Sequence, residues 1–343
     1  MTAGAPATDE EIATVPKVLL HDHLDGGLRP ATLIELAADC GYTGLPSSDA
    51  EELASWFHGA ADSGSLERYL STFTHTVAVM QTRDALERVA REGVVDLAVD
   101  GVIHAEIRMA PELATAGGLG LEDAIQAMVA GLRAGERQAA AQGYQVTTGL
   151  IVSAMRHLDR VGEVADAVVA RRGSGVVGFD LAGPEAGFPA SRHAAALARL
   201  RSAGVPLTLH AGEGDGPASV RDALDQGATR LGHGVRVVED PELLAEVVAR
   251  GVCLEVAPTS NLQTGIASSY AEHPFGRLDR AGALVTVNTD NRLMSQTLPS
   301  AELRHLRDAF SLTRDDLLRY ARTAAASAFV ADADRAALLA RIH

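Results

Sequence analysis

The chain has 343 residues and a formal net charge of −15, because 45 acidic side chains outnumber 30 lysines and arginines. Such a charge repels nucleic acid and anionic membranes, and no stretch approaches the roughly 18 consecutive apolar residues of a membrane span. The two cysteines, Cys40 and Cys253, are too few for a disulfide framework, and residues 1–14 resemble a flexible leader without signal-peptide features, so we expect a cytoplasmic protein.

The first predicted strand, residues 17–23, runs into the polar stretch HDHLDGG. Side chains alternate between the two faces of a strand, so His21, His23 and Asp25 should point one way and Asp22 the other. Two imidazoles side by side are costly to bury without a partner, and a metal ion is the usual partner. Taken alone, the pair also fits one solvated histidine and one core histidine near a turn.

Residues 30–90 carry extra helical sequence between the first and second predicted strands. In a barrel, an insertion at this point covers the mouth formed by the carboxyl ends of the strands. The segment contains the only tryptophan, Trp56, next to Phe57. Two roles are open: residues 50–75 form a lid that excludes water, or the two aromatic side chains only pin a helix to the barrel.

Short apolar or β-branched runs alternate with amphipathic segments of helical period along the chain. This alternation predicts a parallel sheet, and eight such units in roughly 300 residues predict an α/β protein with a closed (β/α)8 TIM barrel. Residues 1–343 would then form a single domain. A doubly wound open sheet is the alternative, but no G-x-G-x-x-G follows the first strand. The eight runs cover residues 17–23, 101–109, 146–154, 175–183, 206–213, 229–235, 252–260 and 283–290.

Unusual polar residues gather at the carboxyl ends of these runs, which converge on one face of a barrel. Three imidazoles and one carboxylate among them suit zinc, which leaves room for a water molecule. The candidate ligands are His21, His23, His210 and Asp290. The other polar residues at these ends are Asp25, the stretch 180–185, Glu213, His233, Asn261 and Asn291.

Glu213 and His233 remain as acid–base groups that bind no metal. Because zinc lowers the pKa of a bound water toward about 7, the pattern indicates a site that adds water to an electrophilic carbon. The other histidines do not share the pattern. We expect His104 in the core of the second strand, and His157 and His273 at the surface or behind the ligands.

Six motifs occur in a fixed order: HDHLDGG, DLAGPE, HAGE, LGHG, PTSN and NTD. Together they resemble the adenosine deaminase family of the amidohydrolase superfamily, over essentially the whole chain. The resemblance implies zinc-dependent hydrolytic deamination of adenosine and 2′-deoxyadenosine to inosine and 2′-deoxyinosine, with release of ammonia. It implies a small purine nucleoside as the partner. Amidohydrolases with two metals usually carry a carbamylated lysine on strand four. Lys17 is the only lysine here, so one zinc per chain is implied.

The resemblance also implies roles for the site residues. Glu213 resembles the acid that protonates or hydrogen-bonds purine N1, which requires a raised pKa, and His233 resembles the residue that orients the attacking water. Asp290 would hold the other side of that water in addition to binding the metal. The backbone N–H of Gly183 would meet N3, and the Asp25 carboxylate would meet the ribose 5′-hydroxyl.

One position departs from the family pattern, because the familiar NTDD is NTDN in this chain. Asn291 can still donate a hydrogen bond to N7 through its amide. Adenine and a 5′-modified adenosine such as aminofutalosine stay open as alternative substrates. Two further alternatives are a hydrolase of another amide or ester, which would need a second metal, and a non-catalytic nucleoside-binding module, which would have lost a ligand or Glu213.

Overall fold

Eight parallel strands form the centre of the structure, a computed structural model that describes residues 4–343. They join in chain order into two four-stranded sheets, β1-β2-β3-β4 and β5-β6-β7-β8. Each strand matches its predicted run to within a few residues at either end. The strands are β1 (Lys17–His23), β2 (Val102–Met109), β3 (Thr147–Met155), β4 (Val176–Ala182), β5 (Thr208–Ala211), β6 (Arg230–His233), β7 (Cys253–Val256) and β8 (Leu284–Val287).

Two short parallel contacts join the sheets into the predicted barrel: β4 meets the residues just before β5, and β1 meets the residues just after β8. At the second contact Asp22 pairs with Asp290. The backbone N–H of His23 donates to Asp290 O (2.7 Å), and the N–H of Asp290 donates to His21 O (3.1 Å). Because this contact runs through three candidate ligands, closing the barrel also brings them together.

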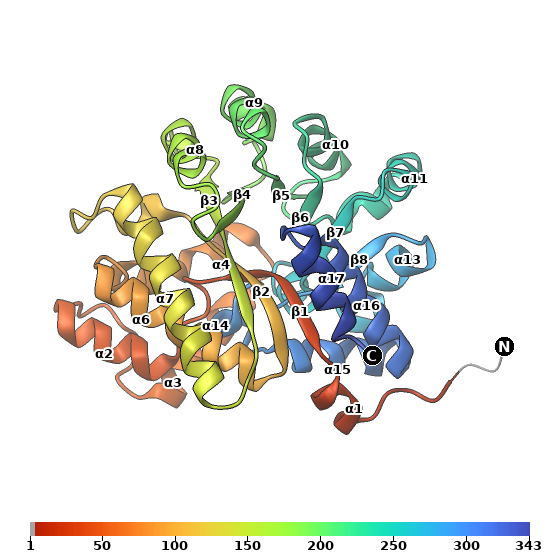
Figure 1. The fold of residues 1–343 in the computed structure, drawn as a ribbon, viewed down its shortest axis with the longest axis horizontal. Coiled ribbons are helices and arrows are strands. Elements are labelled where there is room, and N and C mark those ends of the chain that lie inside the picture. The colour runs from red at the N-terminus through yellow and green to blue at the C-terminus, as the bar shows by residue number, and fades with distance from the viewer. Residues whose placement is uncertain (1–3) are drawn as a thin grey trace.

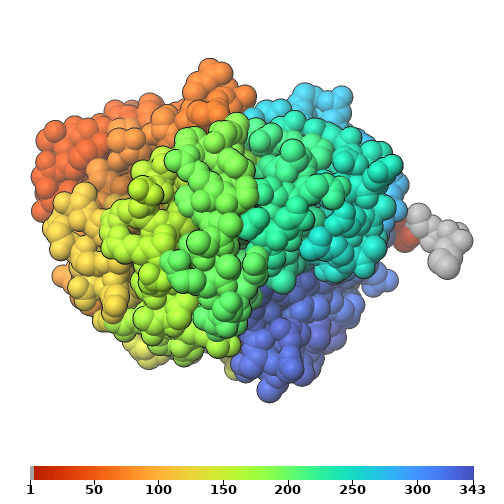
Figure 2. Space-filling view, turned by 90° about the horizontal axis from the view of Figure 1, so that it is seen from above, coloured from red at the N-terminus to blue at the C-terminus, as the bar shows by residue number. Residues whose placement is uncertain are grey.

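Helices surround the strands, and Figure 1 shows α8, α9, α10 and α11 following one another in chain order along one side. Figure 2 shows the same order on one face, from yellow α7 to teal α11. Local signals start several helices; a capping box formed by Thr313 and Asp316 opens α16. The helices after β1 and its insertion are α6 (Arg83–Val99), α7 (Leu121–Ala141), α8 (Val161–Ala170), α9 (Ala194–Ser202), α10 (Pro217–Asp225), α11 (Pro241–Ala249), α12 (Pro258–Gln263), α13 (Phe275–Arg280), α14 (Arg292–Ser295), α15 (Pro299–Phe310), α16 (Arg314–Ser327) and α17 (Asp332–Ala340).

The helical insertion after β1 is shorter than predicted. Four helices lie in it, and the segment predicted as 30–90 ends before Arg83, where α6 begins. Helix α6 leads into β2 and packs along α7, so it is the first helix of the barrel itself. The sequence pattern could not separate the two, since both are amphipathic. The insertion helices are α2 (Pro30–Cys40), α3 (Ala50–Ala61), α4 (Leu66–Ser71) and α5 (Phe73–Val79).

The amino-terminal segment is more ordered than predicted. Part of the expected flexible leader, Asp9–Thr14, forms the short helix α1, and residues 1–3 of that leader lie outside the described residues. A capping box stabilises the start of α1, because the Thr8 side chain accepts from the Glu11 N–H while the Glu11 side chain accepts from the Thr8 N–H. Ile12 anchors the helix, since its side chain is fully buried in the core.

The hydrophobic core runs through the whole described chain. One cluster of buried side chains includes residues from Ala7 to Ile342 and fills the space between the strands and their covering helices. Within residues 4–343, no helix is both long enough and apolar enough to cross a membrane.

Candidate active site

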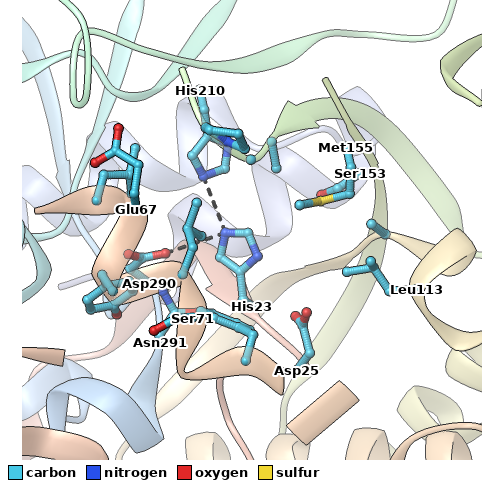
Figure 3. A pocket seen from close by; sticks show the side chains of 18 of the residues that line it. His23, Asp25, Glu67, Ser71, Leu113, Ser153, Met155, His210, Asp290 and Asn291 are labelled. Atoms are coloured by element: carbon cyan, nitrogen blue, oxygen red, sulfur yellow. Dashed lines mark hydrogen bonds and ion pairs between the residues drawn. The ribbon is translucent and has the colours of Figure 1, made fainter. Parts of the chain in front are cut away.

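The four predicted metal ligands meet at the carboxyl ends of the strands. His21 and His23 end β1, His210 lies in β5, and Asp290 follows β8. His23 Nε2 lies 3.3 Å from both His21 Nε2 and His210 Nε2, and Asp290 Oδ1 lies 3.2 Å from His21 Nε2 and 3.4 Å from His23 Nε2. Figure 3 shows His23 between His210 and Asp290.

This donor set fits a divalent metal ion. Its four ligand atoms all lie within 4.8 Å of one another. Metal–donor bonds of about 2.0–2.2 Å bring neighbouring donor atoms to about 3 Å or slightly more from one another, which is close to the four distances given above. Imidazole nitrogens held this close and buried need a shared electrophile, because neutral Nε2 atoms that do not carry protons repel one another. The sequence prediction of a metal-binding group at this place is therefore supported by geometry.

Buried charges behind the histidines orient them. His210 Nδ1 lies 2.9 Å from Asp180 Oδ1, and His21 Nδ1 lies 3.2 Å from Glu255 Oε2. Arg108 lies between the two carboxylates, with Nη2 2.7 Å from Glu255 and Nη1 3.5 Å from Asp180. A carboxylate at Nδ1 places the ring proton there and leaves Nε2 free to bind metal. The sequence pattern included Asp180 in the polar stretch 180–185 but missed Arg108 and Glu255, although charged residues inside apolar strands were a visible signal.

Two ends of strands have unusual backbone conformations. Asp290 and His233 have φ angles of 56° and 60°, in the left-handed region that non-glycine residues rarely adopt. The Ser260 hydroxyl donates to Asp290 Oδ2 at 2.6 Å and holds its carboxylate in place. Such conformations persist where surrounding contacts determine them, and they concentrate at functional sites.

Glu213 and His233, predicted as the acid–base pair, face each other with 3.4 Å between Glu213 Oε2 and His233 Nε2. Burial raises the pKa of Glu213 well above its usual range, and the charges of Asp290 and Glu185 raise it further. The Thr264 hydroxyl donates to Glu213 Oε1 at 3.2 Å. These surroundings favour the protonated form of the carboxyl group, which can donate a hydrogen bond.

The turn after β5 is fixed by Glu185, from the DLAGPE motif. Its carboxylate accepts from the backbone N–H groups of Gly212 (2.6 Å), Glu213 (3.0 Å) and Asp215 (3.1 Å). The side chain of Glu185 is itself buried. These hydrogen bonds fix the backbone that carries Glu213, so the DLAGPE motif holds the HAGE motif in place.

A cavity of about 500 Å³ opens in front of the ligands. All the predicted site residues line it except His21, which is fully buried beside His23. Asp25 follows the end of β1, so it is not on the strand as predicted, yet it still lines the cavity (Figure 3). Burial raises the pKa of Asp25 to about 7. The predicted residues in the wall are His23, Asp25, Gly183, His210, Glu213, His233, Asp290 and Asn291.

Gly183 and Asn291 have environments that suit close contact with a flat ligand. Gly183 has a φ of 93°, and a Cβ there would lie 3.0 Å from His157 Nδ1 and 3.1 Å from Met155 Cε. Asn291 Oδ1 is buried against Gly26, where a Cβ would lie 2.0 Å from that oxygen. Any side chain at position 26 would therefore displace Asn291.

The insertion supplies an apolar part of the cavity wall, through α4 and α5. The aromatic residues that the sequence singled out lie elsewhere: Phe57 is fully buried, and Trp56, which is 37% exposed, packs against Phe57 and His75. His157, expected at the surface or behind the ligands, lines the cavity instead. The wall residues from the insertion are Leu66, Glu67, Tyr69, Leu70, Ser71, Phe73, Thr74 and Val77.

Comparison with known proteins places this geometry in a family. The family profile described as adenosine deaminase matches residues 16–343. Adenosine deaminase 1 of Streptomyces coelicolor is 50% identical over 342 residues, which cover 96% of this chain and 86% of that protein.

Solved structures agree with this match. An adenine deaminase from Arthrobacter aurescens superposes with a TM-score of 0.86 at 29% identity, covering 96% of this chain and 98% of its own. An amidohydrolase from Burkholderia ambifaria with bound Zn gives 0.85 at 28% identity, covering 98% and 94%. The fold is thus shared with these solved structures, and the chain belongs to the adenosine deaminase family.

Proposed function

We propose that this chain catalyses the zinc-dependent hydrolytic deamination of adenosine and 2′-deoxyadenosine to inosine and 2′-deoxyinosine, with release of ammonia. As a member of the adenosine deaminase family it is a hydrolase acting on C–N bonds. One observation carries the proposal: a cluster of four metal donors and a carboxyl group with a raised pKa face the same cavity.

The proposed metal is one zinc ion per chain, held by the three histidines and Asp290. The donor set suits zinc, and the Burkholderia ambifaria relative binds Zn. When bound, zinc lowers the pKa of a water molecule toward about 7 and so supplies hydroxide at neutral pH. The remaining chemistry belongs to the side chains around the cavity.

The protonated Glu213 carboxyl group would donate to purine N1, which draws electrons from C6 and makes that carbon electrophilic. His233, facing Glu213, would orient and polarise the oxygen that adds to C6, and Asp290 would hold its other side. The C–N bond of the tetrahedral carbon then breaks and ammonia leaves. Of the two protons of the added water, one leaves with the ammonia and the other replaces the proton that Glu213 gives to N1. The raised pKa of Glu213 supports its role, because an ionised carboxylate could not donate.

Besides Glu213, the proposed contacts to the purine come from Gly183 and Asn291, which line the same cavity. The N–H of Gly183 would meet N3, where the absence of a side chain allows close approach. The amide nitrogen of Asn291 would donate to N7, since the amide oxygen is buried against Gly26.

We propose that the substrate is a nucleoside and not a nucleotide. Among the cavity-lining residues of the described chain there is no arginine or lysine to neutralise a phosphate. Asp25 would accept the ribose 5′-hydroxyl, and the ionised form of its carboxyl group, present in part at neutral pH because the pKa is about 7, would repel a 5′-phosphate. A site built to bind a hydroxyl discriminates strongly against analogues that lack it, so adenine and 5′-deoxyadenosine should be poor substrates.

The test is to compare kcat/KM for adenosine, adenine, AMP and a 5′-extended adenosine, following the loss of the adenosine absorbance band. We expect adenosine to be strongly preferred. Equal values for adenine and adenosine would contradict the nucleoside assignment. High activity on the 5′-extended compound with little on adenosine would favour a 5′-modified substrate.

We also propose a cytoplasmic location. Both cysteines are free, Cys40 exposed and Cys253 buried, which suits a reducing compartment.

A further inference from the structure

Two buried side chains and one backbone amide form a hydrogen-bonded chain behind His233, on the side away from Glu213. His233 Nδ1 lies 3.0 Å from Asn261 Nδ2, and Asn261 Oδ1 lies 3.2 Å from His273 Nε2. The backbone N–H of Phe275 donates to His273 Nδ1 at 3.0 Å. The exposed fractions of His233, Asn261 and His273 are 1%, 0% and 2%, so bulk water does not compete for these groups.

The direction of each hydrogen bond in this series follows from the backbone N–H of Phe275, at the end away from His233. A backbone N–H can only donate, so Nδ1 of His273 must accept, and the proton of the neutral ring is on Nε2. Burial lowers the pKa of His273 to about 4, so the ring is neutral at neutral pH. The Nε2–H then donates to Asn261 Oδ1, and this fixes which end of the amide faces His233.

The amide therefore presents its NH2 group to His233. A proton on Nδ1 of His233 would face this N–H donor without an acceptor, which is costly in a buried site. The lone pair of His233 is thus on Nδ1 and its proton on Nε2. That Nε2 faces the reacting side, where Glu213 Oε2 lies 3.4 Å away.

We propose that Asn261 and His273 are positioning residues that hold His233 in the Nε2–H tautomer, so that this ring acts in the site as a hydrogen-bond donor and not as a base. The chemical consequence rests on the proposed deamination: His233 can orient and polarise the oxygen that adds to C6, but it cannot take up the proton of that oxygen. Asn261 and His273 lie far apart from His233 in sequence and touch no reacting atom, so their effect passes entirely through the ring.

The tautomer can be measured directly by ¹⁵N NMR of the zinc-loaded enzyme with ¹⁵N-labelled histidine. Ring nitrogens with and without a proton differ widely in ¹⁵N shift, and the spectrum of His233→Gln identifies the His233 signals among the 12 histidines. We expect a protonated Nε2 and an unprotonated Nδ1. A protonated Nδ1 overturns the proposal, and because this measurement needs no substrate, it is separate from any failure of the proposed function.

Asn261→Asp replaces the donor that faces Nδ1 of His233 with an acceptor, and the side chain keeps almost the same shape. A carboxylate accepts from both rings, so Nδ1 of His233 should gain the proton. We expect kcat to fall by roughly 10²–10³-fold, the usual effect of removing one hydrogen-bond donor at the reacting centre, with KM for adenosine little changed. Zinc content is measured on the same sample, so that metal loss is not mistaken for a tautomer effect. An unprotonated Nδ1 in this variant would contradict the proposal.

His273 is tested by a matched pair of variants. His273→Gln keeps an N–H donor near the Nε2 position, whereas His273→Leu removes it and frees the Asn261 amide to rotate. We expect the Gln variant to retain the wild-type tautomer and most of kcat, and the Leu variant to mix tautomers and lose kcat. Equal kcat in the two variants, with the wild-type tautomer in both, would show that His273 only fills space. If neither variant folds, the wild-type spectrum and the Asn261→Asp variant still determine whether the proposed tautomer of His233 is correct.

Discussion

Glu213 shows how a single residue acquires its chemistry from its surroundings. Its carboxyl group is buried beside Asp290 and Glu185, and both its burial and these charges favour the protonated form. Protonation turns an ordinary acceptor into a donor, which the proposed contact with purine N1 requires. Glu213 could be chosen as a candidate from the sequence. The raised pKa that donation to N1 requires is explained only by its surroundings in the fold.

Glu213→Gln is expected to keep the fold and the metal, since Glu213 is not among the metal donors. The amide cannot transfer a proton to N1, so kcat should fall by roughly 10²–10⁴-fold or more. Turnover and bound zinc are measured together. His21→Ala is the comparison, because it should lose metal as well as activity; near-normal turnover in Glu213→Gln would remove this residue from the mechanism.

Asn291 is expected to act on binding more than on chemistry. If its amide nitrogen donates to N7, 7-deazaadenosine should bind more weakly by about 1–3 kcal/mol, the cost of leaving one buried donor without a partner. Competitive inhibition constants for the two nucleosides measure this difference. Replacing Asn291 with alanine should make the two bind alike, and equal binding already in the wild type would show that N7 is not recognised here.

At the scale of elements, Arg108 ties together strands from both sheets. It lies on β2, and its Nη2 donates to Leu20 O of β1 at 2.6 Å and to Glu255 of β7 at 2.7 Å. Asp180 of β4 lies on its other side. The guanidinium is fully buried. Its positive charge offsets part of the negative charge of the two carboxylates that orient the ligand histidines.

Arg108→Met should destabilise the protein by about 3–5 kcal/mol, because it leaves the buried Asp180 carboxylate without an arginine, while Arg230 still pairs with Glu255 at 2.7 Å. Urea unfolding of the zinc-loaded protein measures the change. Arg83→Met is a suitable control, since Arg83 pairs with Glu87 at the surface and exposed ion pairs contribute about 0–1 kcal/mol. Similar losses in both variants would contradict a special role for the buried arginine.

The sequence predicted elements well where the pattern is local and poorly where it is not. The eight strands followed from their apolar runs. The end of the insertion was wrong, because α6 is amphipathic like the helices before it. Helix α1 was missed because residues 1–14 were treated as a leader, although Thr8 and Glu11 carry the capping signal.

At the scale of the whole molecule, the site residues that the sequence named were those that end strands. Barrel closure brings such ends together whatever their distance along the chain, so periodicity and motif were sufficient. His157 and His273 follow no such rule, because their positions depend on the packing of loops and short helices. We propose that the described core, continuous from Ala7 to Ile342, makes the chain one domain in which site and stability are coupled.

Glu302 should make the stability of the protein depend on pH. It lies on α15 and accepts from the Thr259 N–H at 3.1 Å and the Thr297 hydroxyl at 2.7 Å. Burial raises its pKa to about 7 from a usual 4.5. Between these values the folded protein binds more protons than the unfolded chain, so the free energy of unfolding falls as pH rises through this window.

Glu302→Gln should remove this contribution, because the amide keeps the shape and carries no charge. We expect the wild type to lose about 2–3 kcal/mol more than the variant between pH 5 and pH 8, and no further difference to develop above pH 8. Urea unfolding of both proteins at several pH values measures the two profiles. If the free energy of unfolding changes with pH in the same way in both proteins, Glu302 is ionised in the folded protein, and α15 contacts α12 through a charged carboxylate. A wild-type profile that falls more steeply would show that the helix carrying Ser260, which holds Asp290, is stabilised by a protonated carboxyl group.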